Sequence, residues 1–183
     1  MAWRDCQPYG NPEVQTPHMQ ALAEAGITFH HMYTATAMCA PTRQQLYTGL
    51  FPVRNGAYPN HSEVRPGVKS LAHHFQGLGY RVALIGKQHY GPEASFSFEY
   101  LGVCLDKIDQ AGKSNRTLSI FTSEQGAAHP FAKWTCYKRG LKTAFIARWP
   151  GVIPAGAMLA AWMAQQGDRG MMTEMEAERR LRP

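Results

Sequence analysis

Apolar positions along the chain alternate between helical and strand-like spacings. In residues 16–26, Met19, Leu22 and Ala23 form an apolar stripe at the three- and four-residue spacing that predicts a helix. The stretch ITFHHMYT that follows is rich in β-branched and aromatic residues, which favours a strand. Residues 69–79 repeat the helical spacing and lead into YRVALIG, a continuous apolar run typical of a strand buried on both faces of a parallel sheet. The first half of the chain therefore predicts two helix–strand pairs.

The second half continues the alternation. YLGVCLDKIDQAG predicts a helix, RTLSIFTS a strand and TAFIARW a further strand. Helices and strands in this order predict an α/β fold with a doubly wound, mostly parallel sheet. We expect such a sheet to be incomplete in this chain.

Two loops follow predicted strands and carry chemically useful side chains. GKQHYGP, after YRVALI, carries Lys87 and His89, and TSEQG, after RTLSIF, carries Glu124 and Gln125. Open parallel sheets bind ligands outside the carboxyl ends of their strands, so both loops are candidates for one site. The alternative is that these are solvated loop residues and a turn closed by Gly126.

Composition narrows the class of protein. The 183 residues are 44% hydrophobic, which is enough for one globular domain with a core. The formal net charge of +6 favours an anionic partner. The basic residues are scattered, so we expect no nucleic-acid partner, and the apolar runs are too short for us to expect a membrane partner. The four cysteines form no C-x-x-C pair and are interpreted as separate thiols.

The segment CAPTRQQLYTG, residues 39–49, places one of these thiols in an unusual setting. Pro41 suits the first turn of a helix and Gly49 suits its C-terminal end, so Cys39 is expected just before a helix N-terminus. Unpaired N–H groups and the cation Arg43 favour an anion there. Cys39 is then either a buried structural thiol or a nucleophile, or the precursor of one, facing an anionic substrate.

This segment resembles the signature of the type I sulfatases of the alkaline phosphatase superfamily, C-x-P-S/T-R-x-x-L-x-T-G, whose cysteine is oxidised to Cα-formylglycine. GKQHYGP is similar to the family's lysine–histidine loop in its sulfamidase-like form, and residues 121–151 resemble the second metal loop, the downstream lysine and the next strand. Residues 9–34 and 162–180 resemble the segment before the signature and the far C-terminal end. The resemblance implies a partial catalytic α/β domain over residues 1–157 and a C-terminal remnant over 158–183.

The resemblance also implies a function and a set of site residues. The function is hydrolysis of a sulfuric ester on a sulfated small molecule or glycan, through a hydrated formylglycine formed from Cys39 by a formylglycine-generating enzyme. A divalent cation, Ca²⁺ or else Mg²⁺, would assist. The implied residues are Cys39, Arg43, Lys87, His89 and Lys133 for catalysis, and Glu124, Gln125 and Cys39 for the metal.

Departures from the family pattern lead us to expect a shortened sequence. The family supplies two metal ligands from an Asp-Asp pair, and no such pair occurs in these 183 residues. A leaving-group histidine is also missing between GKQHYGP and the next helix. We therefore expect truncation at the N-terminus, internal shortening and impaired activity. The compartment stays open: this chain shows no signal peptide, but a parent protein could be periplasmic, secreted or lysosomal.

Several other interpretations of the sequence stay open. One is a non-catalytic α/β remnant that binds anions, and another is a phosphoester or phosphonate hydrolase of the same superfamily. The pairs His30–His31 and His73–His74 could suggest zinc, but neighbouring residues on a strand or helix do not converge, so both are expected to be structural.

Overall fold

The computed structural model describes residues 2–158 apart from residues 99, 102–104 and 127–131. Its helices, with 3-10 turns labelled η, are η1 (Trp3–Asp5), η2 (Gln7–Tyr9), α1 (Pro17–Glu24), α2 (Cys39–Thr48), α3 (Pro52–Asn55), α4 (Leu71–Gly77), η3 (Glu93–Ser95), α5 (Leu105–Gln110), η4 (Ser114–Arg116) and α6 (Lys138–Leu141). Its strands are β1 (Ile27–Thr28), β2 (Ala83–Leu84), β3 (Tyr100–Leu101), β4 (Ser119–Thr122), β5 (Phe145–Arg148) and β6 (Ala157–Met158). The remnant expected over 158–183 and the C-terminal resemblance over 162–180 lie, but for residue 158, outside the described residues.

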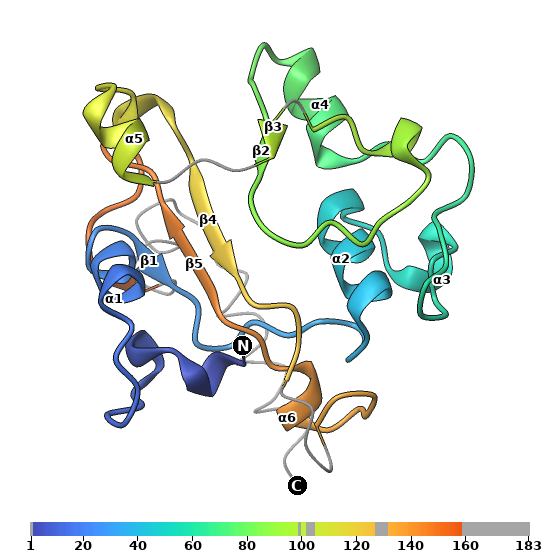
Figure 1. Cartoon of the computed structure of the whole chain (residues 1–183), viewed down its shortest axis with the longest axis horizontal. Helices are drawn as coiled ribbons and strands as arrows, with labels where there is room; N and C mark the ends of the chain where they lie inside the picture. Colours follow the sequence, from blue (N-terminus) through green and yellow to red (C-terminus); the bar gives the residue numbers. More distant parts are fainter. Residues whose placement is uncertain (1, 99, 102–104, 127–131, 159–183) are drawn as a thin grey trace, which may run out of the picture.

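Four strands form the main sheet, in the order β4-β5-β1-β6. Figure 1 labels the first three of them. The α/β class predicted from the sequence is confirmed, but the pairings of this sheet are mixed. Strands β4 and β1 both pair antiparallel with β5, and only β1–β6 is parallel. The reason lies in the connection after β4: the chain turns back through α6 into the neighbouring strand instead of crossing a face of the sheet in a long helix.

A second sheet contains only β2 and β3, paired in parallel over two residues each. The expectation that YRVALIG is buried on both faces is wrong for this structure. Ala83 is exposed and Ile85 is 58% exposed. One short partner strand covers too little of the segment to bury its apolar side chains. The apolar face expected on α4 is also open, since Leu78 is 73% exposed.

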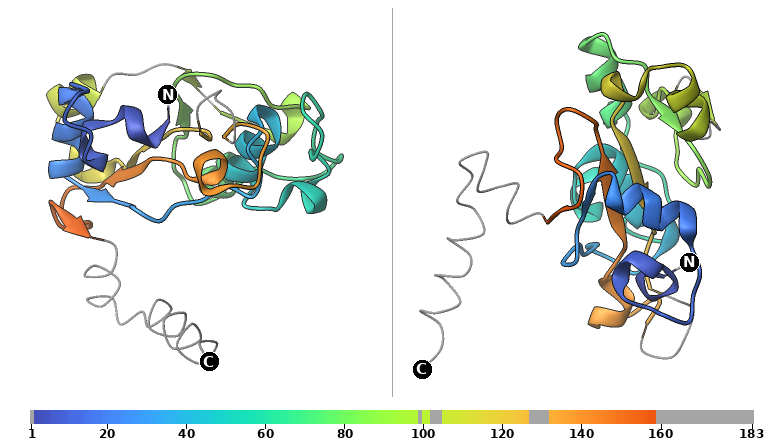
Figure 2. Two further views of the ribbon diagram at one scale, coloured as in Figure 1. Left: turned by 90° about the horizontal axis from the view of Figure 1, so that it is seen from below. Right: turned by 90° about the vertical axis from the view of Figure 1, so that its left-hand side faces the viewer.

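The buried side chains gather at two places. In the main sheet, Ile27 and Ile146 are almost completely inaccessible. A separate cluster forms around α2, where Tyr47 packs with Val64 and Phe96. Figures 1 and 2 show α1 and α5 at one end of the molecule and α2 and α3 at the other. Contacts of Cys39 with Gln125 and of Arg43 with Glu124 place the N-terminal half of α2 at the loop after β4, where the two parts of the fold meet.

Length and apolarity of the helices bear on a membrane location. Within the described ranges, no helix is long and apolar enough to cross a bilayer.

Candidate functional site

The cysteine of the signature begins helix α2. Met38 is the extended N-cap residue, Pro41 lies in the first turn and Gly49, with a φ of 67°, ends the helix. Cys39 is thus the first helical residue, so the helix begins earlier than the sequence predicts, which placed Cys39 just before it. Its side chain is buried, with 6% of the residue exposed. The burial makes Cys39 part of the junction between α2 and the sheet.

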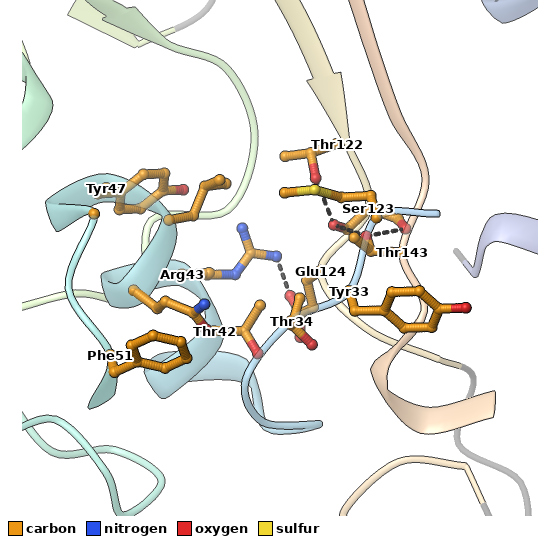
Figure 3. A pocket seen from close by; sticks show the side chains of 14 residues that line it. Tyr33, Thr34, Thr42, Arg43, Tyr47, Phe51, Thr122, Ser123, Glu124 and Thr143 are labelled. Atoms are coloured by element: carbon orange, nitrogen blue, oxygen red, sulfur yellow. Dashed lines mark hydrogen bonds and ion pairs between the residues drawn. The ribbon is translucent and has the colours of Figure 1, made fainter. Parts of the chain in front are cut away.

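Arg43 connects α2 to both of the loops singled out from the sequence. It lies one turn after Cys39, and its Nη1 donates to the carbonyl oxygen of Lys87 at 2.9 Å. Its Nη2 forms an ion pair with Oε2 of Glu124. Figure 3 shows the guanidinium reaching from α2 toward this carboxylate. Both side chains are only 18% exposed, so water screens the pair weakly.

Glu124 stays ionised in this position although it is half-buried. Burial alone would raise the pKa of Glu124, but a hydrogen bond from the Cys39 thiol and the charge of Arg43 outweigh it and hold the pKa below its usual value. The neighbouring Gln125 is buried and donates from Nε2 to the Cys39 sulfur at 3.7 Å. The carboxylate and the amide therefore both contact the signature cysteine.

The loop that carries Glu124 and Gln125 is held by its backbone. Gly126 donates its N–H to the carbonyl of Gly140 at 2.8 Å. A Cβ at Gly126 would collide with the carbonyl of Arg139, so this approach requires glycine. Ser123 bonds through its hydroxyl to Thr143 at 2.7 Å, which ties the end of β4 to the start of β5. Its contacts give Ser123 a structural role at this junction.

His89 lies beside this group on the loop after β2. Burial lowers the pKa of His89 below its usual value, and the nearby Lys87 and His61 lower it further. Its Nε2 lies 3.0 Å from Nδ1 of His61. Its Nδ1 is buried and has no hydrogen-bond partner among the described residues. The ring is therefore held neutral more easily than a free histidine would be.

The two lysines are less closely engaged. Lys87 has an exposed side chain, although its carbonyl accepts from Arg43. Lys133 places its Nζ 5.4 Å from the ring centre of Trp134. The backbone N–H of Trp134 in turn donates to the carbonyl oxygen of Ala37, two residues before Cys39, at 2.9 Å. The structure thus brings the Lys133 loop to the segment before α2, but no described contact joins Lys133 to Arg43 or Glu124.

A calcium site needs six to eight oxygen ligands, and the described residues do not complete one. No group of three or more His, Cys, Asp and Glu side chains able to hold a metal occurs in the described part of the chain. Gln125 Oε1 is buried without a partner and suits a cation, but the Glu124 carboxylate is already paired with Arg43. Glu124, Gln125 and Cys39 therefore lie together without forming a full cation site.

A cavity of about 240 Å³ borders the Arg43–Glu124 pair. Its walls come from α2, from the ends of β4 and β5 and from the segment before α2, as Figure 3 shows. The labelled lining residues include Tyr33, Thr42, Tyr47, Phe51 and Thr122. Cys39 is not among the lining residues, so the cavity adjoins the cysteine site through the ion pair and does not enclose the thiol.

Two side chains next to this site, Asn60 and His61, were not predicted from the sequence. Asn60 Oδ1 accepts from the N–H of Ala40 at 3.3 Å, in the first turn of α2. His61 contacts His89. Both lie in a turn segment, YPNHS, and the only signal in the sequence is a histidine inside a loop. Such a residue is usually solvated, so the pattern gave no reason to select it.

The fold is shared with solved structures. The chain superimposes on Ps i-CgsB with a TM-score of 0.75 and 14% identity, covering 92% of this chain and 70% of that one. It also matches the PsFucS1 sulfatase from Pseudoalteromonas sp. with a TM-score of 0.66 and 18% identity, covering 86% of this chain and 62% of that one. At these identities the likeness concerns the fold alone. The protein therefore has the fold of the sulfatases, which is of the alkaline phosphatase-like class.

Sequence comparison identifies the family. The sequence profile of the Sulfatase family matches residues 1–103, which is more than half of the chain. The chain belongs to the sulfatase family, and its resemblance to the type I sulfatases is confirmed. It is 46% identical over 91 residues to an ulvan-active sulfatase of Formosa agariphila, covering 50% of this chain and 18% of that protein.

A second relative is a human protein. The chain is 36% identical over 97 residues to the human N-sulphoglucosamine sulphohydrolase, covering 50% of this chain and 19% of that protein. Each alignment therefore spans less than a fifth of the length of the curated relative.

Proposed function

We propose that this protein is a sulfuric ester hydrolase that acts on a sulfated carbohydrate or amino sugar. The observation that carries the proposal is the position of the signature cysteine: Cys39 begins α2, is buried, and contacts both Glu124 and Gln125. The substrate class is supported by the names of the relatives, one active on ulvan and one on N-sulphoglucosamine.

Cys39 is the precursor of the nucleophile in this proposal. A formylglycine-generating enzyme would oxidise it to formylglycine, whose hydrated aldehyde supplies the attacking hydroxyl. Arg43 would hold the hydrate and balance the negative charge that gathers around it, since its guanidinium is within reach of both loops. His89 would take up the proton, because its lowered pKa keeps a nitrogen lone pair available near neutral pH.

The negative charge of the substrate's sulfate group would be offset by the two lysines and by a divalent cation. Lys87 and Lys133 would contact the sulfate group as cations. Sulfatases generally use a divalent cation as well. Such a cation, calcium or magnesium, would need ligands beyond Glu124, Gln125 and the residue at position 39, so we propose that hydrolysis by this chain is impaired.

Modification of Cys39 is the first experimental test. The chain should be produced together with an active formylglycine-generating enzyme, and the peptide containing Cys39 analysed by mass spectrometry. We expect an aldehyde at this position, whereas the peptide containing Cys136 keeps its thiol and serves as the internal control. Unmodified thiol at position 39 in every molecule, with the enzyme active on a control substrate, would exclude this nucleophile.

Turnover is the second test. Protein that carries formylglycine should be assayed with a chromogenic aryl sulfate and with N-sulfoglucosamine in excess calcium. We expect only slow release of sulfate, because the missing general acid alone is worth a factor of roughly a hundred to ten thousand. Fast, calcium-dependent turnover that Cys39→Ala abolishes would show that the site is complete. No turnover at all, with sulfate still bound, would favour the non-catalytic anion-binding alternative.

A further inference from the structure

The loop that carries His61 is fastened to two parts of the candidate site. On one side it bonds to α2: Asn60 accepts from Ala40 at 3.3 Å, and Gln44 Nε2 donates to the carbonyl of Ser62 at 2.7 Å. On the other side it bonds to the loop after β2, since the N–H of Val64 donates to the carbonyl of Gly91 at 2.8 Å. His61 is exposed, but both of its chain neighbours are anchored by hydrogen bonds to α2.

The backbone at both histidines adopts a conformation that is unfavourable for residues other than glycine. The φ angle is 64° at His61 and 52° at His89. Left-handed values at non-glycine residues cost free energy and persist only where the surroundings enforce them. Among the described residues only Trp134 shares this property, and it too borders the segment before Cys39. The two loops thus hold the backbone of both histidines in a defined conformation.

The two rings form a direct hydrogen bond. His61 Nδ1 and His89 Nε2 are 3.0 Å apart, and the ring centres are 4.9 Å apart at an angle of 49°. One of these nitrogens must donate and the other must accept, so the pair restricts the tautomer of each ring. With Nε2 engaged by His61, Nδ1 is the nitrogen of His89 that stays available, and it is buried without a partner in the described structure.

Charges around His89 come from several elements. Lys87 lies on its own loop, Arg43 on α2 and Glu124 on the loop after β4. Two of these are positive, and they disfavour a charged imidazole. A neutral ring has two tautomers, and a partner that accepts at one nitrogen selects the tautomer that is protonated there. His61 is the partner of Nε2, and its Nδ1 accepts when its own proton is on the other ring nitrogen.

We propose that His61 is a positioning residue for His89: its Nδ1 accepts a hydrogen bond from Nε2–H of His89, fixes the orientation and tautomer of the ring, and leaves the unprotonated Nδ1 of His89 as the nitrogen that takes up a proton in the site. The use of that nitrogen in sulfate ester hydrolysis rests on the proposed function. The hydrogen bond and the tautomer are properties of the folded chain and can be measured without turnover.

Nitrogen NMR of the full chain with ¹⁵N-labelled histidine tests the proposal. His89 in the wild type should show one pyrrole-like and one pyridine-like nitrogen at a pH where the ring is neutral. His61→Gly removes the ring but tolerates the positive φ, and should give averaged shifts at His89 from two exchanging tautomers. His61→Asn also tolerates this φ and keeps a polar atom close to the Nδ1 position, so it should restore one tautomer. His18→Asn, on the exposed face of α1, is the matched control.

A reciprocal variant covers the case in which His61→Gly does not fold. His89→Asn removes the Nε2 atom, and the ¹⁵N shifts of His61 should then become averaged. Averaged shifts at His89 in His61→Gly with recovery in His61→Asn support the proposal. Unchanged shifts at His89 in His61→Gly, equal shifts in the two His61 variants, or unchanged shifts at His61 in His89→Asn would overturn it. None of these outcomes depends on sulfatase activity, so a failed assay for hydrolysis leaves the test intact.

Discussion

The two sheets of this molecule are built from similar apolar sequences but bury them to different extents. The segment around β5 places Ile146 in the middle of a four-stranded sheet, where its side chain has no exposed surface. The segment around β2 leaves Ile85 58% exposed, beside a single partner strand. An apolar run therefore specifies that a strand is buried only where other strands and helices are available to cover it.

The candidate site lies where these two unequal parts meet. Glu124 follows β4 of the main sheet, Lys87 follows β2 of the small sheet, and Arg43 of α2 contacts both. One arginine side chain thus joins the loop of the well-packed main sheet to the loop of the poorly covered small sheet. Substitutions in the main sheet should therefore lower the free energy of unfolding more than substitutions in the small sheet. Substitutions at Arg43 should have an intermediate effect.

The largest difference is expected for truncation of the two isoleucines. Ile146→Ala should lower the free energy of unfolding by about 3 kcal/mol, because it removes a buried side chain and leaves a cavity. Ile85→Ala should cost less than about 0.5 kcal/mol, since most of its side chain already contacts water. Urea unfolding followed by circular dichroism measures both values. Equal losses for the two variants would show that β2 is covered in solution and that the contrast between the sheets is wrong.

The ion pair at the link should contribute an intermediate amount. A double-mutant cycle of Arg43→Ala and Glu124→Gln should give a coupling energy of about 1.5 kcal/mol, between the values for exposed and fully buried pairs. The cycle for Arg148 and Asp109, whose atoms are 3.0 Å apart but whose carboxylate is 46% exposed, is the control and should give a smaller coupling. A coupling at Arg43 no larger than this control would mean that the two parts are joined by something else.

Sulfate binding should reveal whether the small sheet contributes to the site. Lys87→Ala should weaken sulfate roughly tenfold, the effect expected for one charge-assisted contact of about 1.5 kcal/mol. Wild-type binding should weaken as salt is added. Titration calorimetry at low salt measures the affinities, and Lys107→Ala on α5 serves as the control. Identical affinities for the wild type and Lys87→Ala would place the anion away from the loop after β2.

The smallest effect concerns acid sensitivity of the main sheet. Burial lowers the pKa of His30 from 6.5, and Lys142 and His31 lower it further. Folding therefore favours the neutral ring, so its contribution to stability is complete above pH 6.5 and is lost as the pH falls through the lower folded pKa. His30→Gln should reduce the drop in the urea midpoint between neutral pH and weak acid, whereas His18→Gln should not. An unchanged drop in His30→Gln would contradict this assignment.

The sequence predicted the parts of the site that depend on local patterns. Pro41 marked the first turn of α2 and Gly49 its C-terminal end, and Arg43 followed Cys39 by one helical turn. Glu124 and Gln125 were found because they come directly after a strand. These features need only neighbours along the chain, so a single sequence reveals them.

Features that depend on distant partners were not predicted. The antiparallel course of β5 depends on how the chain returns after β4, and the exposure of Ile85 depends on which strands are present beside it. The bond between His61 and His89 joins residues 28 positions apart on two loops. No periodicity records such a pairing, and only the structure brings the two rings together.

The burial of Cys39 sets a time limit for the oxidation that we propose. In the folded chain this residue is 6% exposed and lies in the first turn of a helix, so a modifying enzyme would have to act before the segment folds. A helix of 10 residues is marginal in water by itself, so the segment would stay accessible until the sheet and its loops cover it. Folding and oxidation would then compete for one newly made segment, and the fraction of molecules that carry the aldehyde would report which of the two came first.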